Sequence, residues 1–253
     1  MSNEQIAMSP QQERFSAKSE GAFAVYRQLV TGDKSLAYFF AYELYATLAA
    51  GLSGALGFAV RQFTLHRLLG SAHGGLAVGK DVLVRQPLRI HSGKKVLIDD
   101  HAVLDVRHVP GDREDTGIYL GDHVLVGRNS LIIAKGGVIR LGDACNISSH
   151  CRIATRSEVT IGESTLIAAY TYIGAGNHHI EDASQPIITQ GMDVKAGVNI
   201  GKNVWVGARA TILDGVTIGD DAVIGAHSLV LEDVPPRAIV VGTPAKVIKY
   251  RNG

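Results

Sequence analysis

The sequence has few of the features that mark the special classes of protein. Its 253 residues include two cysteines and one tryptophan, and its formal charge is +1. Two cysteines cannot supply the disulfide framework of a small secreted protein. The balanced charge argues against nucleic acid as the main partner. Cys145 and Cys151 fall where a sequence repeat has small residues, so we interpret them as core residues and not as a disulfide or a metal pair.

Signals for export or for crossing a membrane are also weak. The first 22 residues are polar, and no basic segment is followed by an apolar run. We therefore expect no secretory signal and a cytoplasmic protein, with residues 1–22 disordered. The uncharged run of residues 44–60 is borderline against the roughly 20 apolar residues that span a bilayer.

The apolar segment around that run has three interpretations. We expect residues 23–70 to form a helical appendage, with short helices packed on the end of the main domain or against a partner subunit. A helix lying in the membrane interface is the second interpretation, and a true span is the third. In the second, residues 35–70 would contact the cytoplasmic face of a membrane.

What the sequence has in abundance is a six-residue repeat of aliphatic residues between Val78 and Val230. Many of these residues are followed by Gly or Asp, and a small or β-branched residue comes four places later. The clearest stretch contains Ile200, Val206, Ile212, Ile218, Ile224 and Val230. A hexapeptide period predicts a parallel β-helix. A β-sandwich would instead show period two with frequent turn signals.

The hexads group in threes, which predicts an all-β triangular prism with one hexad on each side. About seven coils are expected, starting near Val78, Ile98, Leu120, Leu141, Ile161, Ile200 and Ile218. Stacked coils bury a continuous aliphatic column that no single coil could bury alone. We assign this domain to residues 71–253.

Two segments interrupt the repeat. Residues 107–117 are polar and charged, and we expect them to form a solvent loop at one corner. Residues 174–199 form a longer excursion, and loops of that length in a compact repeat are usually functional or disordered. The excursion carries His178 and His179 next to Glu181 and Asp182. Histidine suits proton transfer at neutral pH, so these two residues are candidate bases.

Specific motifs accompany the repeat. They are Val159-Thr160-Ile161-Gly162, Gly176-Asn177-His178, Asn203-Val204-Trp205-Val206-Gly207, Asp233-Val234-Pro235-Pro236 and residues 241–248, VGTPAKVI. With these motifs the chain resembles the hexapeptide-repeat acyltransferases, near the galactoside and maltose acetyltransferases and the polysaccharide O-acetyltransferases. The resemblance covers roughly residues 76–250, and it alone implies a left-handed coil.

The resemblance also implies a function. Related enzymes are trimers with active sites between neighbouring prisms, and acetyl-CoA is their acyl donor. The spacing from Val159 places the catalytic histidine of the galactoside acetyltransferases on His178, which leaves His179 as second choice. The expected activity is O-acetyl transfer to a hydroxyl of a sugar or of a polysaccharide or lipid-linked precursor, in polysaccharide biosynthesis. His178 would act as the general base.

The remaining site residues follow from the same resemblance. Asn177, Gln190 and Trp205 are expected at the acceptor. Small residues at Gly207, Ala208, Gly225 and Ala226 would border the pantetheine arm, and Lys246 and Lys249 would face the phosphates of CoA. A backbone N–H near Gly207 or Ala208 is a candidate donor to the oxyanion. Each of these residues also has an ordinary structural interpretation, as a hexad corner, a wall residue or a solvated tail.

Two departures from the pattern and two other function classes stay open. Leu231-Glu232 stands where related enzymes often have Thr-Lys, and His227 replaces a common glycine. The histidines His101, His123, His150, His178 and His227 lie on successive coils, as in carbonic anhydrase-like zinc proteins, but no motif makes them converge. We therefore expect no metal site. A scaffold without catalytic activity is the other class.

Overall fold

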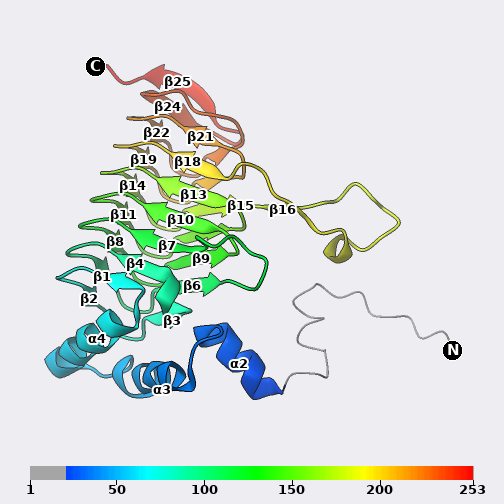
Figure 1. Ribbon diagram of the computed structural model, residues 1–253. Coiled ribbons are helices and arrows are strands. Elements are labelled where there is room, and N and C mark those ends of the chain that lie inside the picture. The colour runs from blue at the N-terminus through cyan, green and yellow to red at the C-terminus, as the bar shows by residue number, and fades with distance from the viewer. Residues whose placement is uncertain (1–20, 253) are drawn as a thin grey trace.

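The computed structural model describes residues 21–252. Three short helical segments cover one end of a stacked three-sided prism, and the last strands cover the other end (Figure 1). The expected disordered residues 1–22 lie outside the described part, apart from Gly21 and Ala22. Gly21 caps α2 and Ala22 begins it.

The prism consists of three parallel sheets, each receiving one strand from every coil. The first sheet contains β1 (Ser71–Ala72), β4 (Ile90–Ser92), β7 (Gly117–Leu120), β10 (Val138–Leu141), β13 (Glu158–Ile161), β18 (Val198–Ile200) and β21 (Thr217–Ile218). The second contains β2 (Ala77–Val78), β5 (Leu97–Ile98), β8 (Leu125–Val126), β11 (Asn146–Ile147), β14 (Leu166–Ile167), β19 (Trp205–Val206), β22 (Val223–Ile224), β24 (Ala238–Val241) and the antiparallel β25 (Lys246–Tyr250). The third contains β3 (Leu83–Arg85), β6 (Val103–Arg107), β9 (Leu131–Lys135), β12 (Arg152–Thr155), β15 (Tyr172–Ala175), β20 (Thr211–Ile212) and β23 (Leu229–Val230). This is the expected left-handed parallel β-helix of seven coils with an N-terminal helical appendage.

The aliphatic residue of each hexad points into the prism. Val126, Ile147 and Ile167 stack in register on three successive strands, and all three are fully buried. The residues four places on fill the corners, and Ala210 and Ala222 are fully buried there. The two cysteines occupy such corners as free thiols, as expected. Burial raises the pKa of the Cys145 thiol to about 11.

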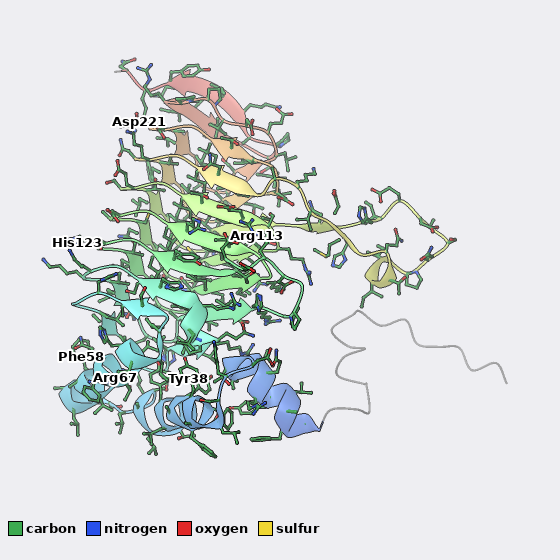
Figure 2. The ribbon with its side chains drawn as sticks, in the orientation of Figure 1. Tyr38, Phe58, Arg67, Arg113, His123 and Asp221 are labelled. Atoms are coloured by element: carbon green, nitrogen blue, oxygen red, sulfur yellow. The ribbon has the colours of Figure 1, made fainter. Side chains whose placement is uncertain are left out.

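The Asp of the repeat has a structural task at the corners. Asp100, Asp122 and Asp220 each accept a hydrogen bond from a main-chain N–H of the coil below, at 2.6 to 2.9 Å. These bonds satisfy corner N–H groups that the parallel ladder leaves unpaired. Figure 2 shows two residues of the edge between the first and second sheets, His123 and Asp221, on the side of the prism away from Arg113.

The coil starts differ from the expected ones in one respect. Val78 and Ile98 lie in the second sheet, whereas Leu120 and the later starts lie in the first. The partner of Ile98 on the next coil is Val126, 28 residues later. The loop between β6 and β7 lengthens this coil, so counting hexads across it shifts the pattern from one face to another.

The helical appendage packs on the N-terminal end of the prism. It comprises α2 (Ala22–Thr31), α3 (Leu36–Leu44), the π-helix η1 (Tyr45–Ala49) and α4 (Gly54–Leu68). Tyr45 and Leu65 are buried, and the Tyr45 hydroxyl donates to the Val82 carbonyl at 2.8 Å. The expected packing of short helices on the prism end is therefore present. Among residues 21–252, no helix is both long and apolar enough to cross a membrane.

Candidate functional site

The long excursion forms a hairpin that projects from the prism (Figure 1). The chain leaves the wall after Ala175 and returns at Val198, so the excursion is slightly shorter than residues 174–199. At its base, β16 (Asn177–His178) pairs antiparallel with β17 (Met192–Asp193), which places His178 opposite Met192. Asn177 and His178 are both exposed. The candidate base therefore stands on a paired strand just outside the prism.

The tip of the hairpin is closed by its own polar side chains. The Asp182 carboxylate accepts from Ser184 N at 2.9 Å, from Ser184 Oγ at 2.6 Å and from Gln185 Nε2 at 2.7 Å. The bond from the Ser184 hydroxyl is the main reason that the pKa of the Asp182 carboxyl lies below its usual value. Among residues 21–252, the Asp182 carboxylate makes these contacts and none to His178.

Gln190 also belongs to this closure. Its Nε2 donates to the Asp182 carbonyl at 2.7 Å and to the Gln185 carbonyl at 3.1 Å, while its Oε1 accepts from Asp182 N at 3.2 Å. Both polar atoms of its side chain are engaged within the hairpin. The acceptor role expected for Gln190 thus competes with a role in loop structure and stays a prediction.

The two histidines have different surroundings. His179 Nδ1 lies 3.7 Å from Glu181 Oε2, with both side chains exposed. Main-chain hydrogen bonds, more than His179, lower the pKa of Glu181. In the described part of the chain, the His178 imidazole has no hydrogen bond or ion pair. The loop carboxylates thus leave His178 free to meet a substrate or another subunit.

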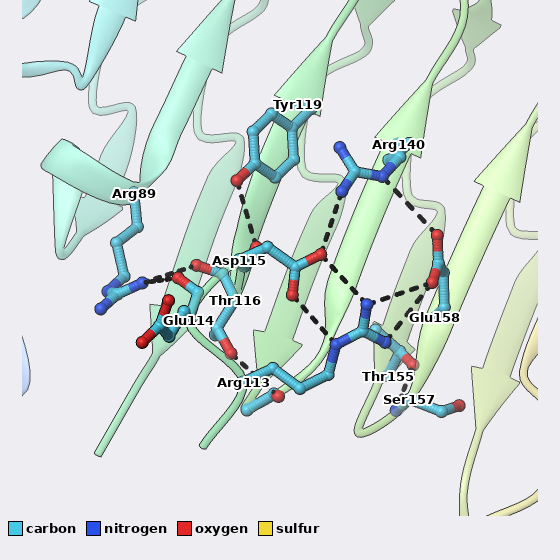
Figure 3. A network of polar contacts seen from close by, with 11 residues as sticks. Arg89, Arg113, Glu114, Asp115, Thr116, Tyr119, Arg140, Thr155, Ser157 and Glu158 are labelled. Atoms are coloured by element: carbon cyan, nitrogen blue, oxygen red, sulfur yellow. Dashed lines mark hydrogen bonds and ion pairs between the residues drawn. The ribbon is translucent and has the colours of Figure 1, made fainter. Parts of the chain in front are cut away.

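The shorter loop between β6 and β7 leaves the prism at the same edge. As expected, it is a largely exposed loop at one corner, and polar contacts also connect it to the wall (Figure 3). Asp115 accepts from Arg113 Nε at 3.0 Å and from Arg140 at 3.1 Å, and Glu158 lies 3.4 Å from Arg113. Because β10 and β13 carry Arg140 and Glu158, the network ties the loop to the wall. Hydrogen bonding from Arg113 lowers the pKa of the Asp115 carboxyl.

The other predicted site residues lie on a different part of the prism. Trp205 is on β19 of the second sheet and is 52% exposed. Residues 207–208 and 225–226 follow β19 and β22, at the edge between the second and third sheets. His178 leaves at the edge between the third and first sheets, opposite the face that bears Trp205. A single chain therefore does not assemble the predicted site.

Coil stacking accounts for the small residues at the edge between the second and third sheets, where the cofactor is expected. A Cβ on Gly207 would lie 2.5 Å from Ala226 N, and one on Gly225 would lie 2.6 Å from a Val241 methyl. Gly207 N donates to the Ile224 carbonyl at 2.8 Å and is unavailable to an oxyanion. In the described residues, Ala208 N has no such acceptor, so it is the better candidate of the two.

The C-terminal lysines lie on β25. Lys246 Nζ is 3.5 Å from Glu232, the acidic residue that departs from the family pattern, and both are well exposed. Such a surface pair is worth at most about 1 kcal/mol, so it does not prevent Lys246 from meeting a phosphate. Among residues 21–252, no group of three His, Cys, Asp or Glu side chains could hold a metal ion.

Sequence reasoning missed one feature, a depression of about 280 Å³ on the outer face of the third sheet. We call it the cationic basin. Its charged lining residues are Arg85, Asp105, Arg107, Lys135 and Arg152. The available signal was charged residues at alternate, outward positions of strands β3, β6, β9 and β12, which the search for aliphatic hexads overlooks.

Comparisons with known proteins identify the family. The model described as "Bacterial transferase hexapeptide (six repeats)" matches residues 197–232. A Mycobacterium tuberculosis protein named as a probable acetyltransferase is 37% identical over 52% of this chain and 44% of its own length. An Escherichia coli K12 protein named as a putative lipopolysaccharide biosynthesis O-acetyl transferase is 36% identical over 55% of this chain and 75% of its own length.

Among solved structures, the fold is shared with a mutant of AntD, an N-acyltransferase from Bacillus cereus in complex with dTDP and coenzyme A. The TM-score is 0.52 at 23% identity, over 76% of this chain and 89% of that one. The chain spans less than half the length of the mycobacterial relative but three quarters of the E. coli one. At 36% identity over that share, the chain belongs to the family of bacterial hexapeptide-repeat acetyltransferases.

Proposed function

We propose that the protein transfers an acetyl group from acetyl-CoA to a saccharide hydroxyl, with His178 as general base. The observation that carries the proposal is the position of His178, which is exposed on a hairpin that projects from the prism and whose imidazole has no hydrogen bond or ion pair with the other described residues. The name of the E. coli relative supports a sugar acceptor in polysaccharide biosynthesis. Coenzyme A in the complex of the B. cereus neighbour supports the donor.

The chemistry requires one proton to move twice. Acetyl-CoA supplies the thioester carbonyl, and a sugar hydroxyl is too weakly acidic to attack it unaided at neutral pH. An imidazole nitrogen of His178 accepts the hydroxyl proton as the C–O bond forms, and it returns that proton to the thiolate that leaves. Ala208 N–H is the candidate donor to the oxyanion.

A neighbouring copy would complete this site. His178 and Trp205 lie on opposite sides of one prism, so a cleft that holds both needs the hairpin of one subunit and the wall of the next. The proposed homotrimer provides such a cleft at each of its three interfaces. Asn177 at the hairpin base and Trp205 on the neighbouring wall would face the acceptor.

Thiol release from acetyl-CoA in the presence of candidate sugars tests the chemistry. His178→Ala should lower the sugar-dependent rate by about 10²–10⁴-fold. His179→Ala is the matched control, because it removes the adjacent exposed imidazole, and it should stay within a few-fold of the native rate. Equal losses in the two variants, or none in either, would contradict the assignment.

Subunit mixing tests the shared cleft. His178→Ala and Trp205→Ala should each be impaired alone. Refolding the two together should restore part of the activity, since some interfaces then pair an intact hairpin with an intact wall. If the mixture gains nothing although mixed trimers form, both residues act within one chain or Trp205 is not in the site.

A membrane contact is proposed for the helical appendage. Leu36, Phe40, Leu44 and Leu48 recur every four residues along α3 and η1, and they are between 51% and 64% exposed. The opposite face of the same helix, with Phe39, Tyr42 and Tyr45, is buried on the prism. A helix that is apolar all round needs cover on both faces. A lipid surface fits this stripe, and exposed Lys34, just before α3, and exposed Arg67, in the last turn of α4, add positive charge to the appendage.

Flotation with anionic vesicles tests this contact. The double variant Phe40→Glu and Leu44→Glu should lose vesicle binding. Leu231→Glu, at an exposed residue near the other end of the prism, should keep it. Unchanged flotation of the double variant would remove the proposal.

A further inference from the structure

The cationic basin contains more positive charge than its own residues neutralise. Arg85, Arg107, Lys135 and Arg152 line it together with a single carboxylate, Asp105. Arg107 and Lys135 are register partners on adjacent strands, and like charges placed side by side on a sheet repel each other. Such an arrangement persists most readily where an anion completes it.

Only one of the two carboxylate oxygens of Asp105 has hydrogen-bond partners. Arg107 donates to Oδ2 at 2.7 and 2.9 Å, and Arg85 donates to the same oxygen at 3.3 Å. The Oδ1 atom of Asp105 is buried without a hydrogen-bond partner, and the residue is 2% exposed. A buried carboxylate oxygen without a donor is rare in folded proteins. Because solvent does not reach Oδ1, Asp105 serves to hold Arg85 and Arg107 in place and is not itself a ligand contact.

Lys135 and Arg152 complete the basin and are uncommitted. Within the described residues, neither has an ion-pair partner. Burial is the main cause of the lowered pKa of Lys135, and the neighbouring Arg107, Arg152 and Arg156 lower it further. A bound anion would reverse that repulsion. The floor between the charges is apolar, formed by Leu83, Val103, Leu131 and Ile133, and it suits the C–H face of a sugar ring.

The basin adjoins the foot of the catalytic hairpin. Arg152 is the register partner of Tyr172 on β15, and the ring of Tyr172 lies over Gly174 on the same strand. At the end of these strands, Arg156 N donates to the Ala175 carbonyl at 3.1 Å, and the Arg156 side chain lies beside Gly176. His178 follows two residues later, so the basin and the hairpin share one edge of the third sheet.

Resting on the proposed function, we propose that the basin binds the anionic group, a phosphate or a carboxylate, of an acidic saccharide acceptor. Lys135 and Arg152 contact the anion. The Asp105 carboxylate holds Arg85 and Arg107 in place beside them. The enzyme then acts on phosphorylated or uronic-acid-containing saccharides in preference to neutral ones.

Binding to the full chain at constant ionic strength tests the basin without relying on catalysis. The probes are glucose 1-phosphate, glucuronic acid and neutral glucose, measured by calorimetry. An acidic sugar should bind more tightly than glucose, and the stronger of the two acidic probes identifies the anion. Lys135→Gln and Arg152→Gln should each weaken that binding by about tenfold or more. Lys94→Gln, an exposed lysine outside the basin at the edge between the first and second sheets, should not.

Kinetics separate this inference from the proposed function. If acetyl transfer occurs, the two basin variants should raise KM for the acidic sugar, with kcat and the rate on neutral sugars nearly unchanged. If no sugar supports CoA release but acidic sugars still bind as expected, the anion-binding proposal is supported and the proposed acetyl transfer is contradicted. Equal binding of acidic and neutral sugars overturns the basin. So do basin variants that alter only the oligomeric mass, since the face would then be a subunit contact.

Discussion

Two loops leave the prism at the same edge and are stabilised in opposite ways. The loop of residues 108–116 is tied to the first sheet by Arg113, Asp115, Arg140 and Glu158 (Figure 3). The hairpin of residues 176–197 is held mostly by its own contacts, centred on Asp182 and Gln190. The first loop therefore behaves as part of the wall. The second presents its residues away from the wall, where a neighbouring subunit or a substrate can reach them.

Removing the hairpin should produce the largest difference between the loops. On the preceding coil, Arg156 and Ser157 connect the third sheet to the first with two residues. Replacing residues 176–197 by such a short corner removes His178, so activity should fall by at least about 10²–10⁴-fold. The melting temperature should change little, since the hairpin buries almost no apolar surface. A cooperative loss of folding would show that the hairpin belongs to the wall after all.

Truncating apolar residues should show the converse. Ile147 is fully buried between Val126 and Ile167, so Ile147→Ala should cost about 2–5 kcal/mol in the free energy of unfolding. Ile180→Ala, on the hairpin at 66% exposure, should stay within about 0.5 kcal/mol. Denaturant titration of the two variants measures this contrast, and similar losses would refute it.

Replacing one carboxylate in each loop should also distinguish the two loops, with smaller effects on activity and stability. Asp182→Asn weakens the closure of the hairpin tip, so it should lower kcat/KM several-fold without changing the melting temperature. Asp115→Asn removes an exposed ion-pair partner and should cost no more than about 1 kcal/mol, with activity retained. Steady-state kinetics and thermal melts of the matched pair test this. A larger activity loss in Asp115→Asn would assign the catalytic role to the other loop.

Lowering the pH should destabilise the hairpin, and this is the smallest effect that we expect. The pKa of Asp182 is lowered in the folded protein, so its stabilising contribution is present above the unfolded value, near 3.9. That contribution is lost as the pH falls through the folded pKa. Cleavage of the hairpin by pepsin should therefore become faster below about pH 4, while the prism stays intact. In Asp182→Asn this additional pH dependence should be absent.

The sequence predicted the structure of each hexad better than the face of the prism on which each hexad lies. Each hexad carries its own inward aliphatic and its own corner, so Ile200, Val206 and Ile212 indicate three faces without knowledge of the rest. The phase between distant coils is not local. The loop after β6 shifts it, which is why Val78 and Ile98 were grouped with the wrong face.

The candidate site divides in the same way. The excursion and its two histidines are visible in the sequence, because a long break in a strict repeat is conspicuous. The engagement of Gln190 within the loop and the pairing of Glu181 with His179 depend on how the chain turns back. The cationic basin was missed because its residues come from four strands of successive coils and meet only through sheet register.

The sequence by itself therefore determined the prism, its number of coils and the histidine-bearing excursion, because a six-residue period encodes burial locally. Only the tertiary structure decided which residues share a face. Strand register placed Arg107 beside Lys135 on one wall, and it set Trp205 on the face opposite His178. Those juxtapositions arise from stacking coils of unequal length, a property that no single hexad contains.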